Sequence, residues 1–407
     1  MKKYIFSILV RGFFAFSGFV FFLFTANYFG PEGRGIISYA TSIFSSLGLI
    51  FSFNLGRTFL IETFQNTEHK KTQLPAYITL NFFFGFLTLL CSFIFWSTIN
   101  SAQQIVSSHT FYAFCISAFF YVWNINGNAF FAAFLKTYVQ EMIIFAIRFL
   151  VVLFIVIYSL IAEKHINEFI FIYSTVIAMG VFLEMAYLIL YCGERKLDFN
   201  FTHFLRAFKK SLIPHLDYLS FNSFPLFVVI ISGWFIEKAE IGKVGFAFQI
   251  INLIYLLSVT ANIRVSAYVS DVGIAQRVTQ FKKLFTATLV LSTAVGLFIY
   301  YILIHFAASS FLKPFAGVSD LFLITLLSIP GYLTYQLFNP IWLEKGMIKF
   351  SAYLNLALLI LSLSVSPWFM MTWGAYGVSW IFALFHFGLL VNQIIIFYRF
   401  KKVSSSI

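Results

Sequence analysis

The chain has 407 residues, of which 60% are hydrophobic and only 10% are charged, and its formal net charge is +12. A soluble globular domain carries roughly 25% charged residues, and a soluble monomer of this composition would expose a larger apolar surface than it tolerates. The composition therefore excludes a soluble globular protein and indicates one whose solvent is the lipid bilayer.

The apolar residues form long runs separated by short polar loops, none of which is long enough for a soluble domain. Because a helix rises about 1.5 Å per residue, it needs about 20 apolar residues to cross a hydrocarbon core of roughly 30 Å. The runs reach this length and do not alternate with period two, so they predict helices and not strands. About twelve transmembrane helices are predicted, at 4–28, 36–61, 75–99, 109–133, 138–161, 167–191, 212–235, 243–266, 281–307, 319–341, 349–371 and 375–398.

The basic residues are distributed unequally over the predicted loops. One side of the membrane holds most of the lysines and arginines, whereas the other holds only Arg34, Lys164, Lys238, Lys243 and Lys313. Cytoplasmic loops carry the excess of positive charge in membrane proteins, so both termini are predicted to be cytoplasmic. This topology accounts for most of the net positive charge, and no nucleic-acid partner is expected.

Two short turns half a chain apart resemble each other. The turn between the first two spans contains Gly35 and is followed by Tyr39, and aligning Gly35 with Gly242 places Phe246 on Tyr39. A repeat in the same orientation is a known plan of transporters, with a pseudo-twofold axis along the membrane normal. The predicted fold is therefore an all-α membrane protein of two six-helix bundles, residues 1–200 and residues 201–407.

Four arginines fall inside predicted spans, where an ionisable side chain at mid-membrane costs some 2.5–3.5 kcal/mol or more and usually faces a protein interior or a water-filled cavity. A guanidinium group binds two phosphate oxygens at once and stays charged, so arginines from several helices suit a phosphate-bearing ligand. An arginine near a span end can instead snorkel to the interface. Arg148 lies deeper in its span, and Glu184 or Glu141 could be its structural partner. The candidate substrate-binding residues are Arg11, Arg57, Arg148 and Arg264.

Polar residues also recur on single faces of the predicted helices, because residues three, four or seven apart share a face. Such stripes predict a water-filled cavity, although small polar residues can equally serve helix packing, and a lone histidine can be satisfied within the core. The candidate lumen-lining residues are Ser42, Asn128, Gln249 and His386. The three cysteines have no metal-binding spacing, so no metal site is expected.

Two sequence features resemble a known family. The turn at residues 30–35 reads GPEGRG, and residues 373–378, between spans eleven and twelve, read WGAYGV. Together with twelve spans in two bundles, they resemble the polysaccharide flippases, and most closely the Wzx-type O-antigen flippases, of the multidrug/oligosaccharidyl-lipid/polysaccharide superfamily. The resemblance implies a multi-pass protein of the bacterial cytoplasmic (inner) membrane that is not an enzyme.

The resemblance also implies a cargo, partners and a driving force. The cargo would be an oligosaccharide linked to undecaprenyl pyrophosphate, moved from the cytoplasmic to the periplasmic leaflet, with a polysaccharide polymerase and a chain-length regulator as partners. Related flippases carry a cation site between spans seven, eleven and twelve, where this chain has Asp217 and Asn355, so an H⁺ or Na⁺ site is expected there. The chain contains no GxxxxGK[ST] pattern for ATP, so no cofactor beyond the coupling ion is expected.

Two other functions share this composition. A membrane polysaccharide polymerase would carry a long outer loop with catalytic residues, and the outer loops of this chain are short. A multidrug exporter of the same superfamily would place acidic side chains in the lumen of its N-terminal half, whereas the deep charges of this half are mostly arginines, which repel cationic drugs. The sequence therefore favours the flippase over both alternatives.

Overall fold

The computed structural model describes residues 2–65, 70–103, 108–160, 165–192, 201–269, 274–305, 313–344 and 346–404, and every regular element within these ranges is helical. The main helices are α1 (Lys2–Phe51), α2 (Leu55–Gln65), α3 (Lys70–Gln103), α4 (Ser108–Ala133), α5 (Thr137–Ser159), α6 (Ile166–Tyr187), α7 (Phe201–Asn222), α8 (Phe224–Ser232), α9 (Lys238–Val269), α10 (Ile274–His305), α11 (Val318–Leu326), α12 (Ile329–Glu344), α13 (Ile348–Trp373) and α14 (Ala375–Ser404).

Within the described ranges, seven helices are long and apolar enough to cross a membrane, or up to nine if each of two bent pairs forms one span. The bent pairs are α7 with α8, at 49°, and α11 with α12, at 44°. Each pair falls on one predicted span, 212–235 or 319–341. The prediction of an all-helical membrane protein is confirmed.

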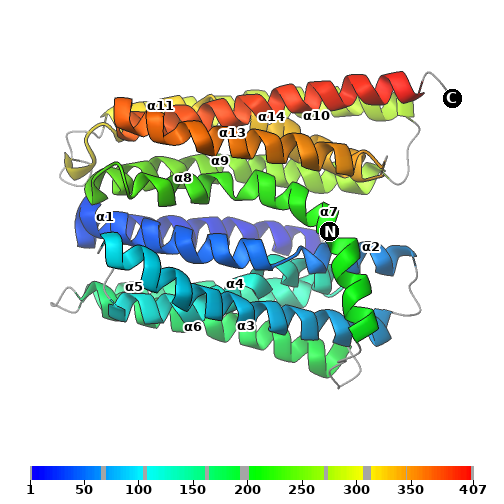
Figure 1. Cartoon of the computed structure of the whole chain (residues 1–407), viewed down its shortest axis with the longest axis horizontal. Helices are drawn as coiled ribbons and strands as arrows, with labels where there is room; N and C mark the ends of the chain where they lie inside the picture. Colours follow the sequence, from blue (N-terminus) through cyan, green and yellow to red (C-terminus); the bar gives the residue numbers. More distant parts are fainter. Residues whose placement is uncertain are drawn as a thin grey trace. The chain divides into compact units, whose positions relative to one another are not determined.

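Helix α1 contains the first predicted span, 4–28, and the larger part of the second, 36–61, which continues past the end of α1 at Phe51 into α2. Gly30 has a φ of 70°, a left-handed conformation that glycine adopts without steric cost, and Pro31 follows it directly. The chain turns back on itself at this kink (Figure 1). The helical segment before Gly30 therefore matches the first predicted span, whereas the second predicted span is divided by a break at residues 52–54.

The chain divides into two compact units, which we call unit 1 (Met1–His215) and unit 2 (Leu216–Ile407). The division falls inside α7, which is helical from Phe201 to Asn222 with Pro214 in its interior. The sequence-based boundary at residue 200 lies directly before this helix. One continuous helix thus belongs to both units.

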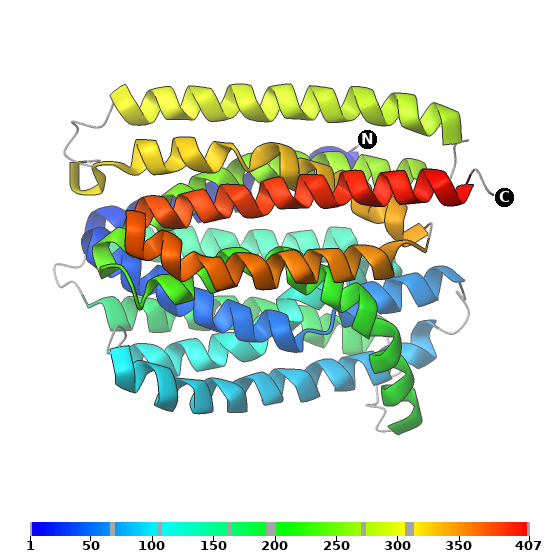
Figure 2. The same cartoon turned by 45° about the horizontal axis from the view of Figure 1, so that its top comes forward.

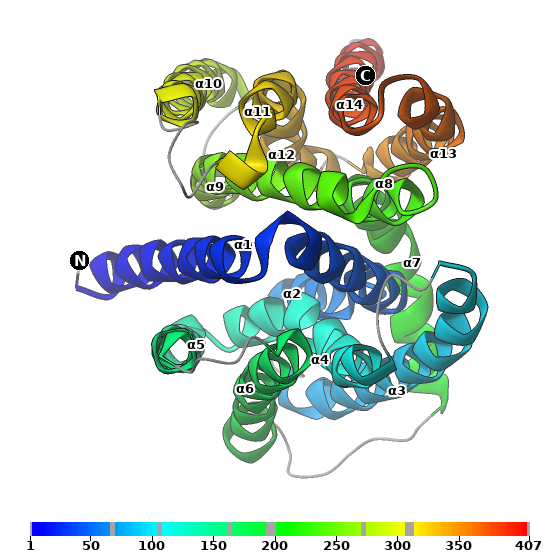
Figure 3. The same cartoon turned by 90° about the vertical axis from the view of Figure 1, so that its left-hand side faces the viewer.

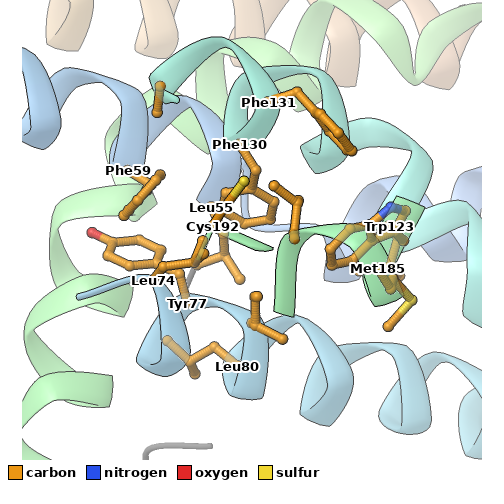
Figure 4. Packing of buried hydrophobic residues seen from close by; sticks show 14 of the residues in the cluster. Leu55, Phe59, Leu74, Tyr77, Leu80, Trp123, Phe130, Phe131, Met185 and Cys192 are labelled. Carbon is orange, nitrogen blue, oxygen red and sulfur yellow. The ribbon is translucent and has the colours of Figure 1, made fainter. Parts of the chain in front are cut away.

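In unit 1, α4 packs against α1, α2, α3 and α6 and lies among them (Figure 3). Buried side chains from these helices meet in one hydrophobic cluster, in which Phe59, Tyr77, Trp123, Phe130 and Met185 take part (Figure 4). Because lipid tails are as apolar as these side chains, close van der Waals packing rather than removal from water holds membrane helices together.

A buried asparagine adds hydrogen bonds across this core. Asn126 of α4 donates through Nδ2 to the Ser52 carbonyl at 3.0 Å and to Asn81 Oδ1 at 2.7 Å, and its Oδ1 accepts the Gly56 backbone N–H at 3.0 Å. A Cβ at Gly56 would lie 2.2 Å from the Asn126 carbonyl oxygen. The start of α2 is therefore fixed against α4 at a distance that only glycine allows.

In unit 2, α14 packs against α11, α12 and α13, and α9 packs against α10, α11 and α12. The α13–α14 pair lies side by side along most of its length (Figure 2). A Cβ at Gly331 of α12 would lie 1.8 Å from the His386 carbonyl oxygen of α14, so α12 and α14 touch backbone to backbone.

Candidate functional site

The strongest candidate site is a buried carboxylate in unit 2. Asp217 lies on α7, and none of its surface is exposed. Its Oδ1 accepts hydrogen bonds from Ser351 Oγ at 2.9 Å and from Asn355 Nδ2 at 3.1 Å. Its Oδ2 accepts from the Tyr335 hydroxyl at 2.7 Å and from Asn339 Nδ2. Four donors from α12 and α13 therefore surround one carboxylate of α7.

A second layer of contacts holds these donors in place. Asn392 of α14 donates to Asn355 Oδ1 at 3.1 Å, and Asn339 donates to the Tyr335 hydroxyl at 3.0 Å. The Tyr335 ring stacks on Phe221, with ring centroids 3.9 Å apart. Four helices of unit 2 thus contribute to one polar cluster, and its side chains have little freedom to rearrange independently.

Helical spacing explains how each helix supplies two donors. Ser351 and Asn355 of α13 are four residues apart, as are Tyr335 and Asn339 of α12, so each pair lies on one face of its helix. On α7, Asp217 lies one turn before Phe221, which places the carboxylate beside the ring that Tyr335 covers.

The cluster has the chemistry of a proton or small-cation site. A buried carboxylate in a membrane is costly unless it is neutralised or compensated, and no described lysine, arginine or histidine forms an ion pair with Asp217. Carboxylate, hydroxyl and amide oxygens are the ligands of hard cations. The amide groups of Asn339 and Asn355 now present nitrogen to the carboxylate, and a rotation of each amide would present oxygen instead.

The predicted pair Asp217 and Asn355 is therefore in direct contact. Sequence reasoning did not name Tyr335 and Asn339 as part of this site. Their signal was the tyrosine and asparagine spacing of four within an apolar span, but nothing in the sequence indicates that α12 faces α7. No group of three or more metal-ligating His, Cys, Asp or Glu side chains occurs in the described part of the chain.

The structure describes the side chains of two of the four predicted arginines, Arg57 and Arg148. The helices that carry Arg11 and Arg264 are described, but the side chains of both residues lie outside the described part. Arg57 is half-buried on the first turn of α2. Arg148 is half-buried on α5, with its guanidinium carbon 4.1 Å from the centre of the Phe14 ring of α1, an arrangement that stabilises a cation.

The carboxylate of Glu184, one proposed partner of Arg148, is bound by neutral groups. Its Oε2 accepts hydrogen bonds from Trp123 Nε1 at 3.2 Å and from Gln140 Nε2 at 3.3 Å, and its side chain is buried. A Cβ at Gly127 would lie 3.0 Å from the same oxygen. Glu184 thus joins α4, α5 and α6 within unit 1.

The candidate lumen-lining residues have different environments. Ser42 and His386 are buried within their units, and His386 Nδ1 lies 2.8 Å from the Phe382 carbonyl. Gln249 is half-buried, and Asn128 is exposed. Polar side chains along α13 and α14 are also buried in unit 2, at Ser351, Asn355, Ser362, Ser366, Ser379 and Gln393.

One buried cation in unit 1 lies where the sequence predicts a loop. Arg34 lies in α1, four residues beyond the Gly30 kink, and only 7% of its surface is exposed. Its Nη1 lies 3.5 Å from Thr25 Oγ1 and its guanidinium carbon 4.6 Å from the centre of the Phe22 ring, while its Nε has no hydrogen-bond partner in the described part of the chain. The GPEGRG turn is therefore a packed helical kink and not a solvated loop.

Comparisons with known proteins find similarity at the level of structure only. No protein-family model and no curated protein matches the chain. The lipid II flippase MurJ in an inward closed conformation is similar with a TM-score of 0.69 and 14% identity, over 96% of this chain and 87% of that one. The MATE multidrug transporter DinF-BH, in complex with a ligand, is similar with a TM-score of 0.69 and 16% identity, over 97% and 94%.

A MATE family transporter of the MOP superfamily in an inward-facing conformation gives a TM-score of 0.65 at 13% identity, over 99% of this chain and 98% of that one. These structures cover nearly the whole chain, so the chain has the fold that MurJ and the MATE transporters share. The predicted fold class is thereby confirmed.

Proposed function

We propose that this protein is a membrane transporter that moves a lipid-linked oligosaccharide across the bilayer by alternating access. Its two units would alternately open a path to either side, while the polyprenyl tail remains in lipid and the charged head group passes through protein. The protein catalyses no covalent chemistry in this proposal, and it acts in the inner membrane of a bacterium.

The observation that carries the proposal is the Asp217 cluster within this fold. A fully buried carboxylate held by four neutral donors, without an ion-pair partner among the described residues, has the chemistry of a site for a coupling ion. A transporter needs such a site to draw on an ion gradient, since one charge crossing about 100 mV supplies roughly 2.3 kcal/mol. We assign the coupling ion, H⁺ or Na⁺, to Asp217 and Asn355, with Ser351, Tyr335 and Asn339 completing the shell.

The proposed cargo follows from arginines inside the spans, three of which lie in unit 1 and one, Arg264, in unit 2. Arg57 and Arg148 are half-buried on α2 and α5, and guanidinium groups bind pyrophosphate oxygens in pairs. We propose undecaprenyl-pyrophosphate-linked oligosaccharide, such as an O-antigen repeat unit, as the cargo, and Arg11, Arg57, Arg148 and Arg264 as its ligands. A polysaccharide polymerase and a chain-length regulator would act on the delivered cargo.

The experiment measures flipping of a fluorescent lipid-linked oligosaccharide in proteoliposomes with an imposed H⁺ or Na⁺ gradient. The wild-type protein should respond to one of the two gradients, and Asp217→Asn should reduce gradient-driven flipping at least about tenfold, or ~1.4 kcal/mol, because the neutral amide no longer binds the ion. Gradient-driven flipping that is unchanged in Asp217→Asn would contradict the assignment of the coupling ion.

A multidrug exporter is the second candidate, and Glu184 is the observation that favours it. This buried carboxylate in unit 1 is an acidic group of the kind that a cationic drug requires. The same proteoliposomes distinguish the two functions. Transport of a fluorescent cationic dye without flipping of the lipid-linked oligosaccharide would select the exporter, and the reverse result would select the flippase.

A further inference from the structure

Helix α7 carries two buried polar residues directly on either side of the division between the units. His215 is the last residue of unit 1, and Asp217 is the second residue of unit 2. Both are buried, with 3% and 0% of their surface exposed. Residues two positions apart in a helix are separated by a rise of only about 3 Å along its axis. A displacement of Asp217 is therefore transmitted to His215.

His215 is anchored to the end of α1 in unit 1. Its Nε2 lies 2.9 Å from the Ile50 carbonyl oxygen, and because a carbonyl only accepts, Nε2 donates. Its ring packs on Phe53, with ring centroids 4.9 Å apart. The remaining nitrogen, Nδ1, is buried without a hydrogen-bond partner in the described part of the chain. This histidine therefore makes one directed contact, and that contact is with the segment where α1 ends.

The segment that His215 contacts is strained. Phe53 and Asn54, between α1 and α2, have φ values of 47° and 49°, in the left-handed region that costs side-chain-bearing residues of order 1–3 kcal/mol each. Such residues persist only where their surroundings hold them. We call residues 51–54 the α1–α2 break. Arg57, a candidate cargo ligand, follows it on the first turn of α2.

Pro214 places a weak point immediately before His215. A proline inside a helix cannot donate to the carbonyl four residues earlier and its ring crowds that carbonyl, so α7 bends more easily there than beyond it. The part of α7 that starts at His215 and contains Asp217 can then move as one piece. A change at Asp217 would pull on the hydrogen bond between His215 and Ile50.

We propose that His215 is the positioning residue that couples the ionic state of Asp217 to the conformation of the α1–α2 break, and so to the placement of Arg57. The inference rests on the proposed function for its purpose, because a transporter must link ion binding to cargo binding. The coupling is reciprocal. If neutralising Asp217 loosens the α1–α2 break, then loosening the break favours the neutralised form of Asp217. Neutralising the carboxylate weakens the four hydrogen bonds that it accepts, because hydrogen bonds to a charged acceptor are the stronger ones. This frees α7 and loosens the break.

The test is a double-mutant cycle on the full-length protein in nanodiscs, read by hydrogen exchange of residues 50–58. Asp217→Asn imitates the neutralised carboxylate, whichever ion does so in transport. We expect Asp217→Asn to speed exchange of this segment about fivefold or more, the lower range of allosteric couplings. In the background of His215→Phe, which keeps the ring packing on Phe53 but loses the donor, Asp217→Asn should have no effect there.

Two further variants separate coupling from simple damage to α7. Ser211→Ala removes a buried hydroxyl one turn earlier, which among the described residues bonds only to the Ala207 carbonyl of its own helix, at 2.7 Å. It should leave the effect of Asp217→Asn intact. His215→Gln restores an N–H donor and should restore part of the effect. Unchanged exchange of α10, which supplies no donor to Asp217 among the described residues, reports that unit 2 remains folded.

The inference is overturned if Asp217→Asn leaves the exchange of residues 50–58 unchanged while His215 is present, or if its effect persists in the His215→Phe background. Neither result depends on cargo or transport. A failure of the proposed function would appear instead as an absence of flipping in the proteoliposomes.

Discussion

Single buried polar side chains determine where the helices of this protein meet. Asn126 bonds to α2, to α3 and to the segment between α1 and α2 from one position on α4, and Asp217 bonds to α12 and α13 from one position on α7. In an apolar environment, a polar group without a partner costs more than in water. Each of these side chains therefore selects one arrangement of the surrounding helices over others with equally good apolar packing.

Asn126→Ala should destabilise unit 1 by about 2–6 kcal/mol, because it removes the partner of the Gly56 N–H and of the Asn81 side chain, and each such loss costs ~1–3 kcal/mol. Chemical denaturation in detergent micelles measures the effect. The matched control is Asn124→Ala, two residues earlier on the same helix, whose side chain is exposed and whose loss should stay within about 0.5 kcal/mol. Equal effects of the two substitutions would remove the structural role given to Asn126.

At the scale of elements, glycine and proline decide how the helices approach and bend. Gly30 allows the kink that turns α1 back, and Gly331 allows α12 to touch the backbone of α14. Proline residues lie inside α3, α7 and α13, where neighbouring helices tolerate a missing backbone donor. The helical contacts that build the Asp217 cluster depend on the approach of α12, because this helix supplies Tyr335 and Asn339.

Gly331→Ala should therefore disturb unit 2 as a whole. The added Cβ would lie 1.8 Å from a backbone oxygen of α14, so the helices must separate, and overpacking of this kind costs ~1–3 kcal/mol or more. We expect a lower melting temperature together with weaker ion-driven flipping, since α12 carries two donors to Asp217. Gly12→Ala, where nothing lies within 4 Å of the added Cβ, is the control, and a melting temperature lowered equally in both would argue against this close contact.

At the scale of the whole molecule, the proposed roles of two distant residues can be tested separately. The proposed ion site lies in unit 2 at Asp217, whereas Arg148, a proposed cargo ligand, lies in unit 1 beside Phe14. Because Arg148 lies on α5 and not at the α1–α2 break that His215 contacts, its substitution should spare ion binding at Asp217.

Arg148→Ala should abolish flipping of the lipid-linked oligosaccharide while leaving the protein inserted in the membrane and its ion binding intact, because Arg148 is a proposed cargo ligand. Arg148→Lys should restore part of the activity, since the charge remains but the two-oxygen geometry is lost. Flipping assays with a parallel measurement of ion-dependent thermal stability check both. Arg399→Ala is the control, because Arg399 also covers an aromatic ring, Phe350 in α13, at 4.1 Å but belongs to no proposed site. Full flipping by Arg148→Ala would refute the arginine-lined path for the cargo.

The sequence by itself determined that this is an all-helical membrane protein, and it located most of the helices. Both follow from local properties: the length of an apolar run against the thickness of a bilayer, and the short polar loops between runs. The sequence also brought Asp217 and Asn355 together, but through resemblance to flippases rather than through any local pattern.

Only the tertiary structure decided which faces of the helices meet. Helical periodicity places Ser351 and Asn355 on one face, and it does the same for Tyr335 and Asn339, but it cannot tell a face that packs on another helix from one that lines a cavity. For the same reason it could not show that Arg34 is buried, or that His215 contacts Ile50, 165 residues earlier in the chain. In a chain that is apolar almost throughout, the partner of each polar residue is set by long-range packing, which no local pattern encodes.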